Sequence, residues 1–360
     1  MSRELPIFTP PVAGHDGHPV GAGLPITIGG MSASAGAAAL GAGLPDPWPG
    51  SRRHPDWLKA KIGAGDEYQD LRRLVRGLNL NTVCEEARCP NIGECWDQRT
   101  ATVMILGDTC TRACGFCAIK TGRPTWFDAD EPRRVAEAVA AMGLEHVVVT
   151  SVARDDLADG GASVFAETIR RLRERCPGMG VEVLIPDFNG AEAPLRTVME
   201  AGPDILNHNV ETVERLQAPV RKRARYDRSL NVLARAKAYA AELGREASTK
   251  SSIMVGLGEE RAELSQAFRD LRAVDCDILT IGQYLRPTVS HLPLVRYYHP
   301  DEFAEMKAEA LALGFRHVES GPLVRSSYHA RDQVPGAALR ALRRRAELDA
   351  DGRVIPGATA

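Results

Sequence analysis

The sequence predicts an α/β fold, a partial (β/α)6 barrel of the TIM type with an extension at each end. Short apolar segments alternate with amphipathic helices, and this order repeats six times between residues 102 and 314. Apolar strands between such helices are typical of parallel strands buried on both faces. Polar residues also gather where the strands end, which is the edge at which such barrels carry their chemistry.

The individual elements of this repeat follow from hydrophobic periodicity. The predicted strands span residues 102–107, 146–152, 181–187, 204–210, 250–258 and 277–284. The predicted helices span residues 131–142, 164–176, 191–201, 228–243, 260–274 and 300–314. Cys176 lies on the apolar stripe of a helix and Cys276 at a helix–strand junction, so we expect both to be packing residues.

The chain before the repeat divides into two parts. Residues 1–50 are dominated by Gly, Ala and Pro, which predicts a disordered low-complexity extension. An import signal would be rich in Arg, whereas Arg3 is the only Arg before Arg52. Residues 51–101 begin with a basic helix and continue in a loop that carries Gly, Pro and Asn. The residues at helical spacing are Tyr68, Leu71, Leu74 and Val75.

The end of the chain forms a separate segment in this interpretation. Residues 315–360 follow the last predicted helix, and the tail after residue 334 is Arg-rich and predicted to be helical. We therefore predict four regions, namely the extension 1–50, the segment 51–101, the barrel 102–314 and the segment 315–360.

Composition excludes several classes of protein. The 45 Lys and Arg nearly balance the 47 Asp and Glu, so charge favours neither a nucleic acid nor a membrane as partner. No apolar run approaches the roughly 20 residues that span a bilayer. Clustered free cysteines favour a reducing compartment, so we expect the protein in the cytoplasm.

Six of the eight cysteines fall between residues 84 and 117, in two triplets. Cys84, Cys89 and Cys95 have the spacing C-x4-C-x5-C, and the second triplet has the spacing C-x3-C-x2-C. A disulfide framework is typical of short secreted domains, and structural zinc of paired C-x2-C knuckles. Thiolate softness and the spacing favour two iron–sulfur clusters, each one ligand short of four. The second triplet consists of Cys110, Cys114 and Cys117.

The second triplet, with Phe116 inside its last gap, resembles the signature of the radical S-adenosylmethionine (radical SAM) superfamily. Three thiolates bind three irons, and the fourth iron remains for the amino and carboxylate groups of S-adenosylmethionine. An electron from the cluster then cleaves the sulfonium, and the protein positions the reactants. This motif by itself names a superfamily and no particular reaction.

Further motifs resemble the lipoyl synthase family over about residues 55–335. They are the first triplet placed before the second, VTSVARDDLADGGA (149–162), LIPDF (184–188), HNVETV (208–213), KSSIMVGLGE (250–259), TIGQYLRP (280–287) and GPLVRSSYHA (321–330). Other radical SAM sulfur-inserting enzymes and non-catalytic iron–sulfur carriers are the alternatives. The first triplet and RSSY disfavour the former, and two three-cysteine sets disfavour the latter.

The resemblance implies a radical SAM barrel whose extensions cover an auxiliary cluster, and a sulfurtransferase reaction. Two sulfur atoms would enter C6 and C8 of an octanoyl chain that is amide-linked to a lysine of a lipoyl carrier domain. The second triplet would hold the 4Fe-4S cluster that cleaves S-adenosylmethionine. The first triplet would hold an auxiliary 4Fe-4S cluster that donates sulfur, with a fourth ligand from Ser326 or Ser327, of which we choose Ser327.

Other residues receive weaker assignments. Thr150 and Ser151 would bind the methionyl amine, Asn209 and Glu211 the ribose or methionyl group, and backbone near Phe116 the adenine. We expect structural roles for His208 and His329. Arg286 and Arg325 are candidates for orienting substrate or cluster.

The expected partners also follow from the resemblance. They are octanoylated carrier domains of 2-oxoacid dehydrogenase E2 subunits and of the glycine-cleavage H protein, an electron donor, and an iron–sulfur carrier that rebuilds the auxiliary cluster. A basic run at residues 220–228 is either a solvated face or a docking surface for an acidic carrier. Its basic residues are Arg221, Lys222, Arg223, Arg225 and Arg228.

Overall fold

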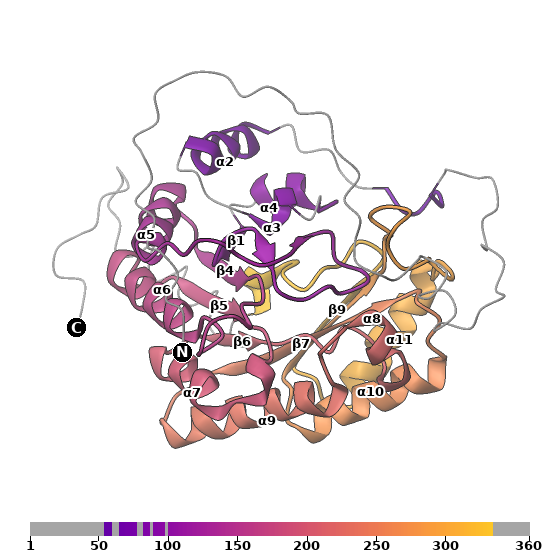
Figure 1. The fold of residues 1–360 in the computed structure, drawn as a ribbon. Coiled ribbons are helices and arrows are strands. Elements are labelled where there is room, and N and C mark those ends of the chain that lie inside the picture. The colour runs from indigo at the N-terminus through magenta and orange to yellow at the C-terminus, as the bar shows by residue number, and fades with distance from the viewer. Residues whose placement is uncertain (1–53, 60–64, 78–81, 87–88, 98–99, 334–360) are drawn as a thin grey trace, which may run out of the picture.

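A seven-stranded, wholly parallel sheet forms the centre of the computed structural model, which describes residues 54–59, 65–77, 82–86, 89–97 and 100–333 (Figure 1). The strands lie in chain order from one edge of the sheet to the other. They are β1 (Ala101–Ile105), β4 (His146–Ser151), β5 (Gly180–Leu184), β6 (Ile205–Asn207), β7 (Ser248–Val255), β8 (Ile278–Gln283) and β9 (His317–Gly321).

Helices connect successive strands and cover one face of the sheet (Figure 1). They are α5 (Glu131–Met142), α6 (Ala162–Arg175), α7 (Glu192–Ala201), α9 (Tyr226–Glu242), α10 (Arg261–Ala273) and α11 (Pro300–Ala312). Shorter turns of helix are η1 (Phe188–Gly190), η2 (Glu214–Leu216) and α8 (Gln217–Val220). Six strand–helix units confirm the predicted α/β fold. The seventh strand, β9, was not predicted, because its sequence HVESG is short and mostly polar.

The two faces of the sheet differ in polarity. Val147, Val149, Val181 and Val183 belong to the apolar core on the helix-covered side. The alternate positions face the opposite, concave side, since successive side chains of a strand point to opposite faces. That face carries Thr102, His146, Thr150, Glu182, Asn207, Lys250, Ser252, Thr280 and Glu319. The expectation of continuously apolar strands is therefore wrong for the concave face.

A buried ion pair lies at the centre of the concave face. The Nζ of Lys250 is 3.0 Å from Oε1 of Glu182, and neither side chain is exposed. The amide of Asn207 donates a hydrogen bond of 2.9 Å to the same carboxylate. Burial opposes ionisation, but the nearby ammonium of Lys250 holds the pKa of Glu182 below its usual value. These contacts join β5, β6 and β7 across the inside of the barrel.

The terminal segments close the open side of the barrel. Helix α2 (Asp66–Gly77) was predicted, but the first triplet lies on α3 (Val83–Glu86), on α4 (Ile92–Asp97) and between them, where only a loop was expected. Thr82 pairs with Val103 of β1 in an antiparallel bridge. After β9 the chain passes close to Gly282 of β8, where a Cβ atom would lie 2.1 Å from the carbonyl oxygen of Val324. The chain then reaches β4 through η3 (Ala330–Gln333) (Figure 1).

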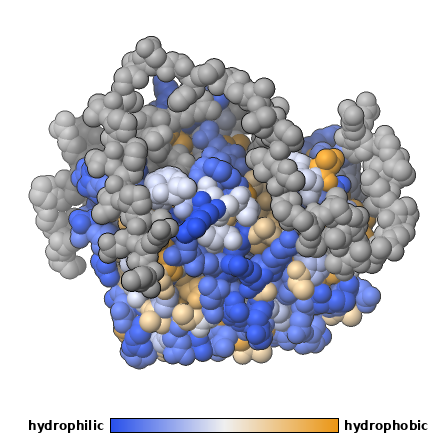
Figure 2. Space-filling view, viewed as in Figure 1, coloured by the Kyte–Doolittle hydropathy of each residue, from blue (hydrophilic) through white to orange (hydrophobic). Residues whose placement is uncertain are grey.

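Some predicted regions lie outside the described residues, namely the extension 1–50 and the tail after residue 334. The four-region division of the chain stays a prediction. Within the described ranges, every helix is too short or too polar to cross a bilayer. Figure 2 shows that hydrophilic residues dominate the described part of one face of the molecule.

The buried pair makes a prediction about stability. Lys250→Met leaves the Glu182 carboxylate without its cation, so we expect a loss of about 3–5 kcal/mol in the free energy of unfolding. Adding Glu182→Gln removes the unpaired charge and should restore most of that loss. Urea unfolding of the two variants and the wild type measures both effects. A double variant as unstable as Lys250→Met would contradict this interpretation.

Candidate active site

The second cysteine triplet lies in a loop that follows β1. The strands β2 (Thr109–Cys110) and β3 (Lys120–Thr121) pair with each other and frame this loop. Cys110 ends β2, whereas Cys114 and Cys117 lie in the turn between the two strands, and all three thiols are free and partly buried. The loop therefore presents three thiols beyond the carboxyl end of β1.

Contacts from two distant segments support this loop. The N–H of Gly115 donates to the carbonyl of Val220 at 2.9 Å, and the N–H of Leu292 donates to the carbonyl of Gly115 at 3.0 Å. A Cβ atom at Gly115 would lie 2.7 Å from Cγ of Leu292, so the close approach requires glycine. The His291 ring also lies 3.1 Å from the Cys117 carbonyl, measured from Nε2. The turn is thus held from both sides.

Burial keeps the thiols of Cys114 and Cys117 protonated in the absence of a metal. It raises the pKa of Cys114 to about 12, against the opposing effect of Arg221, and the pKa of Cys117 to about 11. No three His, Cys, Asp or Glu side chains in the described ranges converge as ligands of a single ion would. A four-iron cluster instead binds each thiolate at a separate corner, and a bound metal displaces the thiol proton. Three free thiols in one loop fit that requirement.

Two buried polar atoms without partners lie at the carboxyl ends of two strands on either side of β5. They are Oγ of Ser151, at the end of β4, and Oδ1 of Asn209, just after β6. Thr150 differs, since its hydroxyl donates a hydrogen bond of 2.9 Å to the carbonyl of Leu184 on the next strand. An unpaired buried polar atom is costly unless a ligand or water satisfies it. Ser151 and Asn209 therefore keep their predicted roles as candidates, while Thr150 already has a structural partner.

Charged side chains are buried beside the second triplet. The side-chain amide of Asn209 donates a hydrogen bond of 3.0 Å to the Glu211 carboxylate. Burial raises the pKa of Glu211, although Arg221 opposes the shift. Arg221 itself is buried and donates to the carbonyl of Val210 and the hydroxyl of Ser229. Phe116 packs at the edge of the apolar cluster on this side of the barrel. Asn209 and Glu211 thus lie beside the second triplet, and the roles predicted for them toward S-adenosylmethionine stay predictions.

The first triplet forms a second group of coupled thiols. The N–H of Cys89 donates to the carbonyl of Cys84 at 3.0 Å. Burial, reinforced by the Cys89 thiol, raises the pKa of Cys84 to about 11. Burial also raises the pKa of Cys95, with further contributions from the other two cysteines. Cys84 belongs to a large apolar core, against which Cys95 and Cys110 also pack.

The RSSY segment lies against the first triplet. The side-chain amide of Asn91 donates a hydrogen bond of 2.6 Å to the carbonyl of Leu323. The Tyr328 hydroxyl donates a hydrogen bond of 3.1 Å to the Glu94 carboxylate. Arg325 opposes the burial-driven rise in the pKa of Cys89, which places its guanidinium near that thiol. Ser326 and Ser327 lie between these contacts along the chain, and both are partly buried. The choice of Ser327 as ligand stays a prediction.

The remaining predicted residues divide by their contacts. The His208 ring contacts the carbonyl of Ile185 and the hydroxyl of Ser229, as a structural residue would. The His329 ring stacks on Tyr328 at 3.9 Å between centroids. Arg286 donates to two carbonyls of its own loop, which favours a structural role over substrate binding. Cys176 and Cys276 are buried in the two apolar clusters, as expected of packing residues.

The basic run is only partly a surface. Arg221 is buried, and Arg228 forms an ion pair of 3.2 Å with the unexposed carboxylate of Asp187. The expectation of one continuous exposed patch is wrong for these two residues, because Arg228 pairs with a buried acid and Arg221 donates to a buried carbonyl. Lys222, Arg223 and Arg225 remain exposed.

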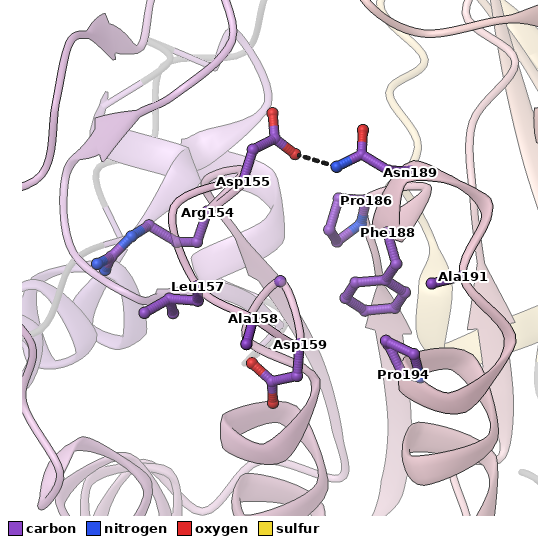
Figure 3. A pocket seen from close by; sticks show the side chains of 11 residues that line it. Arg154, Asp155, Leu157, Ala158, Asp159, Pro186, Phe188, Asn189, Ala191 and Pro194 are labelled. Carbon is purple, nitrogen blue, oxygen red and sulfur yellow. Dashed lines mark hydrogen bonds between the residues drawn. The ribbon is translucent and has the colours of Figure 1, made fainter. Parts of the chain in front are cut away.

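Sequence reasoning missed a network that holds the second triplet. Arg112, between Cys110 and Cys114, makes contacts with Asp155, Asp187 and Asn189. The loops that follow β4 and β5 bring these partners together, and Figure 3 shows Asp155 bonded to Asn189 beside a small pocket. The sequence signal was the pair of motifs ARDD and PDFNG, which directly follow two predicted strands.

A buried carboxyl group also supports the start of the cysteine loop. Glu131 accepts a 2.7 Å hydrogen bond from the N–H of Leu106, which has φ of 69°. Arg154, which is also buried, donates a hydrogen bond of 3.2 Å to the Leu106 carbonyl. Burial raises the pKa of Glu131 to about 7, although the N–H of Leu106 opposes the shift.

This raised pKa predicts a pH dependence of stability. From pH 4.5, the ordinary pKa of Glu, to about pH 7, the folded chain keeps a proton that the unfolded chain releases, so stability falls as pH rises. Glu131→Gln should therefore gain stability relative to the wild type as pH increases across this window. Thermal unfolding at several pH values measures the difference, with the exposed Glu137→Gln as control. A difference that does not change with pH would contradict the assignment.

Comparison with known protein families matches two parts of the chain. Residues 104–271 match the Radical SAM superfamily. Residues 46–89 match the N-terminal domain of lipoyl synthase of the Radical SAM family. The first match covers most of the barrel and the second triplet, and the second covers the segment before β1 together with Cys84 and Cys89.

Individual relatives agree with these matches. The lipoyl synthase of Oceanobacillus iheyensis is 61% identical over 80% of this chain and 91% of its own length. That of Symbiobacterium thermophilum is also 61% identical, over 80% of this chain and 89% of its own length. Among solved structures, methylornithine synthase is 16% identical with a TM-score of 0.44, over 76% of this chain and 86% of that one. On the identity and coverage of the sequence relatives, this chain belongs to the lipoyl synthase family of radical SAM enzymes.

Proposed function

We propose that this protein is a lipoyl synthase that inserts sulfur at C6 and C8 of an octanoyl chain amide-linked to a lysine of a lipoyl carrier domain. The product is protein N6-lipoyl-lysine. The observation that carries the proposal is the presence of two separate three-thiol sets in a chain that belongs to this family. When bound, one 4Fe-4S cluster supplies the electron that cleaves S-adenosylmethionine, and the auxiliary cluster is consumed as the sulfur substrate.

The chain assigns its own residues to two tasks. Cys110, Cys114 and Cys117 would hold the reducing cluster, while Ser151 and Asn209 would bind S-adenosylmethionine through atoms that have no protein partner. The turn around Gly115 is covered by the segment that carries Leu292, which would limit the access of water to a cluster bound there. Exclusion of water protects a reactive radical from side reactions.

The first triplet and RSSY would hold the sulfur donor. Cys84, Cys89 and Cys95 supply three thiolates, and Ser327 supplies a harder oxygen ligand. An oxygen-bound iron is the weakest corner of a cluster held otherwise by thiolates, so this corner would be lost first. The contact between Tyr328 and Glu94 supports this proposal, because it keeps the serine segment beside the triplet.

Charge complementarity supports a docking site for the carrier. Lys222, Arg223 and Arg225 are exposed in the loop between α8 and α9. Lipoyl carrier domains of dehydrogenase E2 subunits and the glycine-cleavage H protein are the partners proposed for this loop, together with an electron donor and an iron–sulfur carrier. Free thiols in both triplets make the reducing cytoplasm the proposed compartment.

The decisive experiment is mass analysis of an octanoylated carrier domain after anaerobic reconstitution of the enzyme. We expect two four-iron clusters in each chain and a gain of two sulfur atoms on one lysine. Cys114→Ser should abolish formation of 5′-deoxyadenosine, because it removes a ligand of the reducing cluster. Cys89→Ser should retain that product but transfer no sulfur. A chain that binds one cluster and adds no sulfur would refute the proposal.

A second prediction concerns the oxygen ligand. Ser327→Cys replaces the weak corner with a strong thiolate, so cluster content should persist while lipoyl formation falls about tenfold. Iron and sulfide analysis with product mass spectrometry measures both quantities. Ser326→Cys is the matched control, and we expect it to retain activity. Unimpaired two-sulfur product from Ser327→Cys would count against a required oxygen ligand.

A third prediction concerns docking. Lys222→Glu with Arg225→Glu should slow the reaction of the carrier protein about tenfold at low salt, because electrostatic steering is lost. The reaction of a short octanoyl-lysine peptide should change little. Arg170→Glu with Arg171→Glu on α6 makes the same change of charge elsewhere on the surface. Equal losses with the carrier and the peptide would exclude the loop as a docking site.

A further inference from the structure

Arg112 is a buried cation that lies between Cys110 and Cys114 in the second triplet. Its side chain is 6% exposed. Its Nε and Nη2 lie 2.9 Å and 2.7 Å from the two carboxylate oxygens of Asp155, in a bidentate arrangement. Its Nη1 lies 2.7 Å from Oδ1 of Asp187, and Nη2 also donates 3.0 Å to Oδ1 of Asn189. Three residues from two different loops thus hold one guanidinium.

The backbone at the same place is directed at a cysteine sulfur. The N–H of Arg112 donates to Sγ of Cys110 at 3.4 Å, and the N–H of Ala153 donates to the same sulfur at 3.3 Å. The N–H of Thr111 donates to the Ala153 carbonyl at 3.0 Å. Cys110 is therefore tied both to its own loop and to the segment after β4, next to Asp155.

The partners of Arg112 are themselves rigidly placed. Three consecutive residues have positive φ, a left-handed backbone conformation that residues other than glycine rarely adopt. They are Phe188, Asn189 and Gly190, with φ of 44°, 54° and 82°. The Asp187 carboxylate accepts a hydrogen bond of 3.0 Å from the N–H of Asn189, and this bond stabilises the turn. Figure 3 shows the Asn189 amide bonded to Asp155. The pocket between the two loops has a volume of about 50 Å³.

The electrostatics of the network are consistent with a fixed geometry. Hydrogen bonds from Arg112 hold the pKa of Asp155 below its usual value. Burial alone would raise the pKa of Asp187, but Arg112 holds it low. A guanidinium bound by two carboxylates on separate loops cannot rotate without breaking charged hydrogen bonds. The backbone beside Arg112 is held as well, because the N–H of Thr111 donates to the Ala153 carbonyl and the N–H of Asp155 donates to the Thr111 hydroxyl.

We propose that Arg112 is a positioning residue that, held by Asp155, Asp187 and Asn189, directs two backbone N–H groups at the Cys110 sulfur and so raises the reduction potential of the cluster bound there. Donors to a cluster sulfur favour the reduced, more negative state, and outer residues tune a metal site through its ligands. The inference rests on the proposed function only in requiring a cluster at the second triplet.

The test uses two variants that leave the charge unchanged. Arg112→Lys keeps the cation but loses the bidentate fork. Asn189→Gly removes an uncharged contact at a position whose positive φ suits glycine. The control is Arg215→Lys, because Arg215 binds Glu263 in the same bidentate manner at a site away from the cysteines. All three are made in the full chain and loaded with both clusters.

Two measurements separate positioning from a general loss of structure. A redox titration followed by electron paramagnetic resonance gives the potential of each cluster, and the cluster whose spectrum changes with S-adenosylmethionine is the one at the second triplet. Hydrogen exchange of the Arg112 and Ala153 amides in cluster-free protein reports how firmly these two N–H groups are held when no cluster is bound. We expect Arg112→Lys to lower only that cluster's potential and to speed this exchange.

The outcomes are distinguishable from a failure of the proposed function. A wild type that binds no cluster at the second triplet refutes the function. A wild-type cluster with unchanged potential in Arg112→Lys and Asn189→Gly overturns the inference, as does an equal shift in both clusters or in Arg215→Lys. If Arg112→Lys does not fold, the potential of Asn189→Gly decides.

Discussion

The parallel arrangement of the seven strands is the constraint on which the rest of this structure depends. Because every strand runs in the same direction, all of their carboxyl ends meet at one rim. The loop with Cys110, the segment around Ala153, the turn at Asp187 and the residue Asn209 follow four different strands, yet they share that rim. Helices cover only the outer face, so the concave face is free to carry polar groups such as Lys250 and Glu182.

The two terminal segments complete what the six strand–helix units leave open. The segment before β1 bridges to that strand through Thr82, and the chain after β9 passes over Gly282 to reach β4. These paths bring RSSY beside the first triplet, although more than 200 residues separate them, as the 234-residue contact between Glu94 and Tyr328 illustrates.

Burial of the thiols links metal binding to the stability of the site. The raised pKa values of Cys84, Cys114 and Cys117 mean that the protein alone favours neutral thiols. A metal must therefore supply the energy that ionises them, and binding should release protons. The donors around Cys110 act differently, since they are already directed at its sulfur before any metal is bound.

Local pattern in the sequence determined the six strand–helix units, α2, and the two cysteine sets, because periodicity and spacing are properties of neighbouring residues. It also placed Ser151 and Asn209 at strand ends. Only the tertiary structure revealed β9, the polar concave face and the burial of Arg221, because these depend on which strand or loop each residue meets. The same holds for Arg112, whose sequence neighbours are cysteines but whose partners lie 43 and 77 residues away. Hydrogen bonds and ion pairs over such separations are decided by the packing of the chain, and no local pattern encodes them.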